Sequence, residues 1–403
     1  MNVLLLTLID FYTLETSNIY TDLMQEFVDQ GHNVYIISPT EKRNKHKTQL
    51  LIKEKYQILK LKIGNIQKTN TIEKGISTIL LDGQFKSGIK KYFSDIKFDL
   101  ILYSTPPISF SKTIAYIKRK CGAFTYLLLK DIFPQNAVDL GILRRNLLHK
   151  FIYMYFRIKE QRLYINSDMI GCMSEENVRY VINHNPQISS EKVELNPNTI
   201  KYKPLTMNRT RKEILNEFGV DYTHTVFIYG GNLGKPQGIE FLCQCLKAVD
   251  NFNGVTNIIV GSGTEYQKIK SFIEDNGIVN SILVPYLEKD KFDQLLCASD
   301  VGLIFLDNRF TIPNYPSRLL SYLQASLPIL MSSDSSTDLK NHILDWNIGL
   351  WNKSDDLKTF VQNYKSLLIK EIRIELSNNS LKVLKEKFDV SFSFDTIIKH
   401  INN

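Results

Sequence analysis

The stretch Thr311-Ile-Pro-Asn-Tyr-Pro-Ser-Arg-Leu-Leu-Ser-Tyr-Leu-Gln-Ala-Ser-Leu-Pro328 is typical of a loop that runs into a helix. Pro316 interrupts the preceding chain, and the hydroxyl of Ser317 is suited to cap the first turn. Leucines and a tyrosine then recur at helical spacing, which predicts one buried face. A helix start with free backbone N–H groups and Arg318 in its first turn is suited to hold an anion. The alternative is an ordinary helix with a solvated arginine.

The composition indicates a globular protein with reduced cysteines. Of the 403 residues, 43% are hydrophobic and 23% charged, which leaves room for two domains. The five cysteines are scattered and odd in number, so no disulfide framework is expected. Cys243 and Cys245 have no second pair or nearby histidine, and we predict no metal site there. The first residues lack a cationic leader, and no apolar run is long enough to span a membrane. We therefore expect a cytoplasmic protein.

The net charge of +8 lies in the first half of the chain. Residues 1–200 hold 27 Lys and Arg against 19 Asp and Glu, whereas residues 201–403 hold 23 of each. The segment 142–165 has six Lys and Arg against one Glu, interleaved with aromatic residues. It is typical of a helix on an anionic membrane surface, or of an amphipathic helix with a solvated face. The basic stretch 42–62 offers a second contact. No nucleic-acid motif is present, so we predict no nucleic-acid partner.

Both halves of the chain alternate short apolar runs with amphipathic stretches. In the first half, strands are expected at 3–9, 34–38, 99–104, 123–129 and 169–173. The second half starts the same pattern again at Thr225. This alternation predicts an α/β fold, with two doubly wound, Rossmann-like domains facing a central cleft at the carboxyl ends of their strands. The expected domains are residues 1–198 and 199–375, followed by a helical tail at 376–403 that packs back toward the first domain.

Three turns in the second half follow predicted strands. They are Tyr229-Gly-Gly-Asn-Leu-Gly234, Val260-Gly-Ser-Gly-Thr264 and Val284-Pro-Tyr-Leu-Glu-Lys289. Glycines allow the backbone to approach a ligand closely, and an aromatic loop can receive a flat base. Each turn taken alone is also compatible with a purely structural connection.

The order of these motifs resembles a known family. Together with Ala298-Ser-Asp-Val-Gly-Leu303 and Pro316-Ser-Arg-Leu-Leu-Ser-Tyr-Leu323, they resemble the C-terminal domain of GT-B glycosyltransferases, most closely the retaining family 4. Within that family the chain is similar to WbuB-type enzymes of capsule and O-antigen (lipopolysaccharide) synthesis, which include N-acetylfucosamine transferases. The resemblance extends to the first half through Ser104-Thr-Pro-Pro-Ile-Ser109, Lys130-Asp-Ile-Phe-Pro-Gln-Asn-Ala-Val-Asp-Leu-Gly141 and Asn196-Pro-Asn198.

The resemblance implies a retaining transfer from a UDP-sugar to a lipid-linked saccharide, with no cofactor and no obligatory metal. It also implies that residues 199–375 form the sugar-nucleotide-binding domain and residues 1–198 the acceptor-binding domain. In such enzymes the donor phosphate is thought to take the acceptor proton. The implied donor-binding residues are Gly231, Asn232, Gly234, Gly261, Ser262, Pro285, Tyr286, Leu287, Ser317, Arg318 and Ser321. The acceptor-side residues are Asp10, Lys130, Asp131 and Asn136, and the catalytic candidates are Asp131, Arg318 and Lys235. Asp131 and Asp10 each follow a predicted strand, although loop-capping aspartates are common; Asp139 is a weaker candidate.

The chain departs from the family pattern at two places. The family's pair of glutamates falls on Pro313 and Ser321, and the Arg and Lys of the Gly-rich turn fall on Asn232 and Gln237. The expected phosphate clamp then depends on Arg318, on Lys235 and on helix N-termini. Two alternatives stay open: a UDP-sugar 2-epimerase, and a non-catalytic partner that keeps the fold. An NAD-dependent dehydrogenase is disfavoured, because no dinucleotide fingerprint follows the first strand. We expect a peripheral enzyme on the inner face of the cell membrane.

Overall fold

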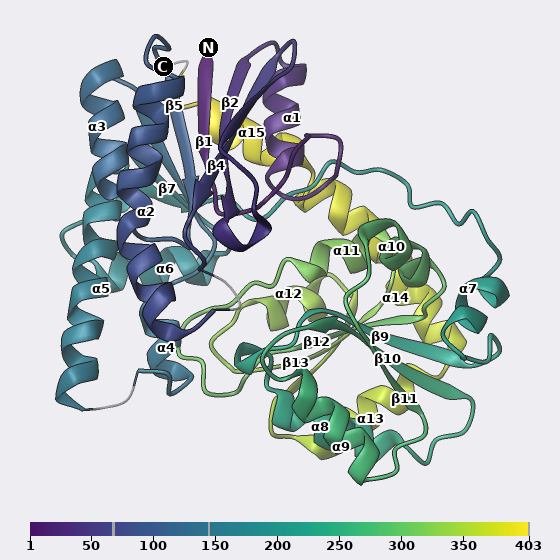
Figure 1. Ribbon diagram of the computed structural model, residues 1–403. Coiled ribbons are helices and arrows are strands. Elements are labelled where there is room, and N and C mark those ends of the chain that lie inside the picture. Colours follow the sequence, from purple (N-terminus) through teal and green to yellow (C-terminus); the bar gives the residue numbers. More distant parts are fainter. Residues whose placement is uncertain (67–68, 144–145, 402–403) are drawn as a thin grey trace. The chain divides into compact units, whose positions relative to one another are not determined.

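The computed structural model describes residues 1–66, 69–143 and 146–401 of the chain. The chain divides into two compact units, each with its own sheet (Figure 1). Unit 1 contains residues 1–201 and 390–403, and unit 2 contains residues 202–389. Within the described residues, no helix has the length and apolar character needed to cross a membrane.

Unit 1 is built on an eight-stranded sheet with the order β3-β4-β2-β1-β5-β6-β7-β8. Every pairing is parallel except that of β3 with β4. The strands are β1 (Asn2–Leu6), β2 (Asn33–Glu41), β3 (Gln49–Ile52), β4 (Tyr56–Ile63), β5 (Leu100–Ser104), β6 (Phe124–Leu129), β7 (Met169–Cys172) and β8 (Val193–Leu195). Most are apolar on both faces, as parallel strands covered by helices on both sides require.

Helices cover both faces of this sheet (Figure 1). They are α1 (Thr21–Asp29), α2 (Thr71–Tyr92), α3 (Ser111–Cys121), α4 (Gln135–Asp139), α5 (Leu147–Asn166), α6 (Glu175–His184) and α15 (Val390–Ile398). On one face α3 packs against both α2 and α5; on the other, α1 packs against the C-terminal helix α15. Phe394 of α15 lies edge-on to Phe27 of α1, with their ring centroids 4.9 Å apart. The chain therefore returns to unit 1 after completing unit 2.

Unit 2 is built on a six-stranded parallel sheet with the order β11-β10-β9-β12-β13-β14. Its strands are β9 (Thr225–Asn232), β10 (Val255–Ser262), β11 (Ser281–Val284), β12 (Val301–Phe305), β13 (Ile329–Ser333) and β14 (Gly349–Lys353). Numbered from β9, this is the 3-2-1-4-5-6 order of the doubly wound nucleotide-binding fold. The predicted α/β class with two Rossmann-like domains is confirmed.

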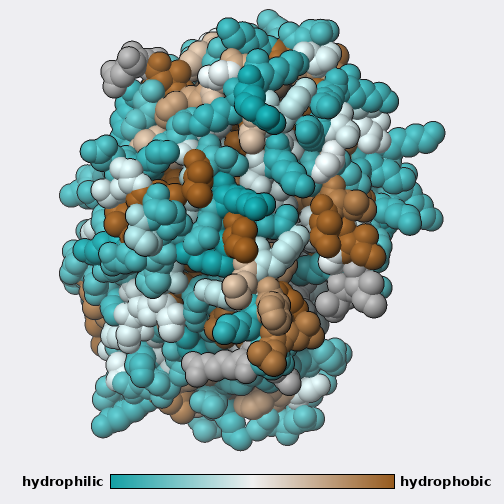
Figure 2. All heavy atoms as spheres, turned by 90° about the vertical axis from the view of Figure 1, so that its left-hand side faces the viewer, coloured by the Kyte–Doolittle hydropathy of each residue, from teal (hydrophilic) through white to brown (hydrophobic). Residues whose placement is uncertain are grey.

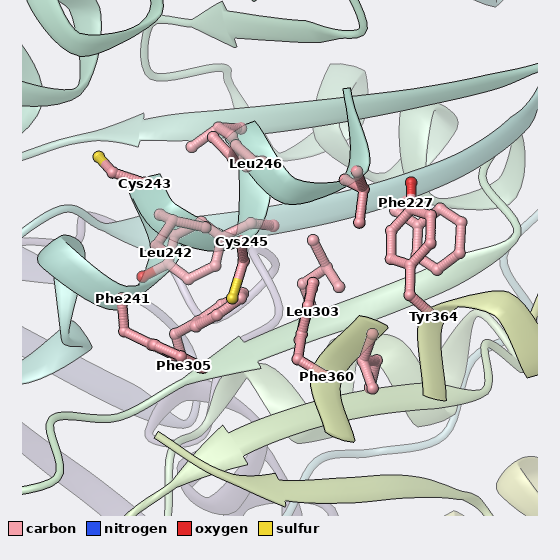
Figure 3. Close-up of a cluster of buried hydrophobic side chains, with 14 of the residues drawn as sticks. Phe227, Phe241, Leu242, Cys243, Cys245, Leu246, Leu303, Phe305, Phe360 and Tyr364 are labelled. Atoms are coloured by element: carbon pink, nitrogen blue, oxygen red, sulfur yellow. The ribbon is translucent and has the colours of Figure 1, made fainter. Parts of the chain in front are cut away.

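A helical layer on one face of this sheet buries the core shown in Figure 3. The helices of unit 2 are α7 (Arg211–Glu217), α8 (Ile239–Val249), α9 (Tyr266–Asp275), α10 (Lys289–Cys297), α11 (Arg318–Gln324), α12 (Leu339–Asp345), α13 (Leu357–Ser366) and α14 (Lys370–Lys387). Phe227 of β9 stacks on Tyr364 of α13 with ring centroids 3.8 Å apart. Cys243 and Cys245 of α8 belong to the same core, and burial raises the pKa of Cys243 to about 11. Both thiols therefore pack as apolar side chains.

Some elements differ from the expectations drawn from sequence. The patterns do not predict α2, whose apolar residues are spread around the helix and interrupted by three glycines. They also miss the short strands β3, β8 and β14. The expected boundary between residues 375 and 376 lies inside α14, which belongs to unit 2; α15 alone packs with unit 1. One continuous helix across residues 370–387 is the physical reason for the later boundary.

Candidate functional site

The strand order of unit 2 reverses its direction at one place, between β9 and β12. From β9 the chain proceeds outward to β10 and β11, then crosses to the other side of β9 and proceeds through β12, β13 and β14. The crevice outside the carboxyl ends of β9 and β12 is the topological switch point, where open α/β sheets bind ligands. The Gly-rich turn follows β9, and the stretch 311–328 follows β12. The two strongest sequence motifs therefore converge on this crevice.

Backbone packing explains the glycines in the turn after β9. Gly231 has φ of +134°, a conformation that a residue with a side chain rarely adopts. A Cβ atom at Gly263, after β10, would lie 2.1 Å from the backbone oxygen of Leu233. The turn is further held by the Tyr229 hydroxyl, which donates to the backbone oxygen of Asn232 over 2.8 Å. Gly231 and Asn232 themselves are exposed. The ends of β9 and β10 thus form a tight ledge that presents its backbone to solvent.

Arg318 reaches across the switch point to this ledge. Its guanidinium carbon lies 4.3 Å from the centroid of the Tyr229 ring. A Cβ atom built on Gly231 would lie 3.3 Å from Nη2 of the same guanidinium. Nη1 is buried and has no hydrogen-bond partner among the described residues. A buried guanidinium donor without a partner calls for an explanation, and a bound oxyanion would supply one.

Tyr322 ties the two sides of the switch point together. Its hydroxyl accepts a hydrogen bond from the backbone N–H of Gly230 over 3.1 Å and donates to the backbone oxygen of Leu303 over 3.0 Å. The side chain is fully buried, and burial raises the pKa of its phenol. Tyr322 therefore fixes α11, and with it Arg318, against β9 and β12.

The carboxylates that follow β12 and β13 already have partners. Asp307 forms a two-point ion pair with Arg309, with both N–O distances 2.8 Å. Asp334 accepts backbone N–H bonds from Ser336 at 2.7 Å and Thr337 at 3.0 Å through Oδ1. Burial raises the pKa of Asp334 to about 6. These two acids therefore organise their own loops.

One expectation about a helix start is wrong. Ser317 precedes α11 in a helical conformation, and its side chain makes no capping hydrogen bond, so it does not act as the predicted N-cap. Helix α8 does not begin directly at the Gly-rich turn. A 3-10 segment, Lys235–Gln237, intervenes, and Gly238 at the start of α8 packs against the backbone at 306–307. Within the turn, the N–H groups of Leu233 and Gly234 already donate to the Ser262 backbone oxygen and to the Gln237 side chain, which leaves the exposed backbone at 231–232 and Arg318 facing the crevice.

The other predicted donor-side residues lie along the same edge of the sheet. Gly261 and Ser262 end β10 and pair in register with Gly231 and Asn232 of β9. Pro285, Tyr286 and Leu287 follow β11, and the Tyr286 side chain is 65% exposed. Ser321 is partly buried on α11, and Lys235 is exposed at the start of the 3-10 segment.

In unit 1, four polar residues gather where β5 and β6 end. The Thr105 hydroxyl accepts from the backbone N–H groups of Lys130 at 3.1 Å and Asp131 at 3.2 Å, and donates to the Asp131 backbone oxygen at 3.0 Å. The Asn136 side-chain amide donates to both carboxylate oxygens of Asp131, each at 2.9 Å. The switch point of this sheet lies between β1 and β5, next to this group.

Burial gives the neighbouring acid and base of this group unusual titration properties. Burial raises the pKa of the Asp131 carboxyl to about 6, against the opposing effect of the Asn136 hydrogen bonds. Burial lowers the pKa of the Lys130 ammonium to about 7. Both groups thus titrate near neutral pH, as general acids and bases in active sites often do.

Asp10 has a different setting from the one expected. Its carboxylate forms an ion pair with Lys60 of β4, whose ammonium also donates to the Ser38 hydroxyl at 2.8 Å and the Phe11 backbone oxygen at 3.1 Å. Lys60 is 1% exposed. The pair fixes the loop after β1, which gives Asp10 a structural partner that the sequence did not reveal.

The sequence alone did not identify three residues that shape these sites. Thr105 lies inside a quoted motif, so its position beside Pro106 could have drawn attention. In the sequence, Tyr322 looks like any other apolar position of its helix, and Lys60 is one of many basic residues. Their roles come from tertiary hydrogen bonds.

Comparison with known proteins agrees with this architecture. No protein-family model matches the chain. WbjE of Pseudomonas aeruginosa, a probable glycosyltransferase, is 23% identical over 259 residues, which are 63% of this chain and 62% of that protein. The matched part thus spans less than two thirds of that relative.

Solved structures extend the likeness to the whole chain. WaaG, a glycosyltransferase involved in lipopolysaccharide biosynthesis, superposes with a TM-score of 0.68 at 12% identity over 98% of both chains. Sucrose-phosphate synthase from Thermosynechococcus elongatus gives 0.77 at 12% identity, covering 100% of this chain and 99% of that one. Anabaena HepE in complex with UDP-glucose gives 0.70 at 12% identity with the same coverage. The fold is that of GT-B glycosyltransferases.

Proposed function

We propose that the protein is a retaining glycosyltransferase that transfers a sugar from a UDP-sugar to a lipid-linked saccharide. The observation that carries the proposal is the Arg318 guanidinium, held at the switch point of unit 2 with Nη1 buried and unpartnered. A nucleoside diphosphate offers the oxyanion that this donor lacks. HepE, a structure with the same fold, is a complex with UDP-glucose.

The chemistry of this site is electrostatic. When the bond between the sugar and the diphosphate breaks, negative charge develops on the leaving group. Arg318 and the exposed Lys235 would provide positive charge, and the exposed backbone at 231–232 would face the diphosphate, because the N–H groups of Leu233 and Gly234 already have partners. We infer that these groups stabilise the leaving group without an obligatory metal. The exposed Tyr286 would offer its ring to the uracil, and Ser321 its hydroxyl to the ribose or phosphate.

We assign the acceptor to unit 1. Asp131, oriented by Asn136, would accept a hydrogen bond from the acceptor hydroxyl, while Lys130 would contact its polar groups. The motif resemblance favours an N-acetylated sugar such as N-acetylfucosamine, and a role in capsule or O-antigen synthesis. The match to WbjE and the likeness to WaaG, which acts in lipopolysaccharide biosynthesis, support this direction.

We further propose that the protein is cytoplasmic and binds the inner face of the cell membrane through α5. Leu147, Phe151 and Ile158 of this helix are 77%, 68% and 46% exposed, on one side of the helix. Figure 2 shows hydrophobic side chains among hydrophilic ones on the molecular face that carries α2, α3 and α5. Apolar residues flanked by cations suit the interface of an anionic bilayer.

Calorimetric titration of UDP and GDP, with EDTA present, tests the donor site. We expect UDP to bind without metal and Arg318→Ala to weaken it about 10- to 100-fold, the worth of a charge-assisted hydrogen bond to phosphate. Arg209→Ala is the matched control, since Arg209 makes an exposed ion pair with Glu217. Equal UDP affinity in both variants would refute the assigned clamp.

One observation favours a second candidate, a non-catalytic protein that binds the nucleotide. Pro313 and Ser321 occupy the positions of the family's glutamates, and neither can supply a carboxylate. Turnover separates the two candidates. Release of UDP from UDP-linked N-acetylated sugars in the presence of membrane-extracted lipid acceptors supports the glycosyltransferase. Tight UDP binding without release, across the same set of donors, supports the binding protein.

A further inference from the structure

Unit 1 contains a pocket between α4 and the start of α5. Its volume is about 520 Å³, within the range of sites that enclose small organic ligands. Its apolar lining consists of Val138 of α4, Leu143, and Leu147 and Tyr153 of α5, and its polar lining of Gln135, Asn146, His149 and Lys150. Three aliphatic side chains and an aromatic ring favour an apolar occupant, and the lysine favours an anion beside it.

The pocket continues into the exposed apolar surface of α5. Leu147 both lines the pocket and is 77% exposed. Leu148 and Phe151, at 67% and 68% exposure, follow it along the helix. Contiguous exposed apolar surface of this kind marks interaction sites on proteins. The start of α5 therefore offers a hydrocarbon chain apolar contacts both inside the pocket and on the exposed surface beside it.

Helix α4 connects the pocket to the acceptor-side carboxylate. Helix α4 is five residues long, and it carries both Asn136, which binds Asp131, and Val138, which lines the pocket. The neighbouring Gln135 also lines the pocket and accepts a hydrogen bond from Tyr153 over 3.4 Å. One short helix thus joins the polar group at Asp131 to the apolar wall.

We propose that this pocket binds the hydrocarbon chain of the lipid-linked acceptor, with the phosphate at the end of the chain facing Lys150. The ligand class is a phosphate carried on a single hydrocarbon chain. This inference rests on the proposed function, because it assigns the lipid part of the same acceptor. It adds a site that selects the lipid, in addition to the site that recognises the sugar.

Titration of farnesyl monophosphate into the full-length protein tests the pocket. We expect the wild type to bind farnesyl monophosphate. Val138→Trp, whose indole fills the pocket, should bind it at least about tenfold more weakly, because each lost methylene contact lowers the affinity about fourfold. Leu147→Ser, an exposed position, removes apolar wall without threatening the fold and should also weaken binding. Val279→Trp, at a valine that is 79% exposed in unit 2, is the matched control and should bind as the wild type. Lys150→Glu should weaken farnesyl monophosphate more than farnesol.

The outcomes separate this inference from the proposed function. Absence of farnesyl monophosphate binding, or equal binding by Leu147→Ser and wild type, overturns the pocket assignment. Dioctanoyl phosphatidate binding as tightly as farnesyl monophosphate also overturns it, in favour of general contact with bilayer lipids. UDP is titrated into the same samples. Loss of pocket binding with normal UDP binding rejects the pocket alone, whereas pocket binding without UDP binding supports the lipid site and rejects the proposed donor.

Discussion

Replacing Asp131 with asparagine should stabilise unit 1 at pH 8, although it removes the carboxylate that we propose for the acceptor side. Burial raises the pKa of this carboxyl from its ordinary value of 3.8 to about 6. The folded state therefore holds the proton more tightly than the unfolded chain does. It follows that the ionised carboxylate costs folding stability above about pH 6, and that this cost fades as the pH falls toward about 4.

The size of the effect follows from the same two pKa values. A difference of about two units corresponds to about 3 kcal/mol at pH 8 and about 1 kcal/mol at pH 4.5. The substitution also removes part of the hydrogen bonding to the Asn136 amide, which costs about 1 kcal/mol. The variant should thus be about 2 kcal/mol more stable than the wild type at pH 8, and about equal to it at pH 4.5.

Hydrogen exchange of the β6 amides is a suitable assay, because β6 ends two residues before Asp131 and its residues 125–129 are buried. A gain of about 2 kcal/mol slows exchange through local opening about 30-fold. The comparison of variant with wild type at each pH cancels the pH dependence of intrinsic exchange. Asp95→Asn, at an exposed aspartate of the same unit, is the control and should show no such gap. Equal β6 exchange in the Asp131 variant and wild type at pH 8 would refute the buried, ionised carboxylate.

Three further changes test the packing and the surface. Gly263→Ala should destabilise unit 2 by about 1–3 kcal/mol, because its Cβ would lie 2.1 Å from a backbone oxygen, while Thr264→Ala should be nearly neutral in urea unfolding. Tyr322→Phe should lower the unfolding free energy of unit 2 by about 1–3 kcal/mol, since it removes the hydroxyl that pairs with the Gly230 N–H and the Leu303 carbonyl. Tryptophan fluorescence reports this unfolding because both tryptophans lie in unit 2. Phe151→Glu should lower binding to anionic vesicles more than about tenfold, and Val279→Glu should not; retained flotation of the Phe151 variant would exclude α5 from the membrane contact.

The fold could be predicted from sequence because each strand and each amphipathic helix leaves its own short-range hydrophobic periodicity. The turn after β9 was predictable for a related reason: a strand that runs into several glycines needs close backbone approach wherever it lies. Helix α2 escaped because its apolar residues surround the axis, so no single stripe marks it. Its burial depends on neighbours on more than one side, which periodicity does not report.

Candidate side chains were less predictable than the elements that carry them. The position of Asp131 after a buried strand is a local property, but its raised pKa depends on burial and on Asn136, five residues later. Asp10 also follows a buried strand, four residues after the end of β1, but its environment differs because Lys60 reaches it from β4. Two aspartates in loops after buried strands thus differ through contacts that no sequence window contains.

The missing glutamates change the electrostatics of the donor site in a definite direction. With a serine at position 321, α11 brings no negative charge to the crevice, and Asp307 is occupied by Arg309. The charge of Arg318 is therefore left for a ligand, held in place by the Tyr229 ring. In the proposed donor site, phosphate affinity would therefore come from Arg318, whereas no carboxylate of α11 would orient the sugar and ribose hydroxyls. We accordingly predict that nucleotide binding and turnover are separable properties of this chain, so that UDP release, in addition to UDP affinity, is the measurement that identifies an enzyme.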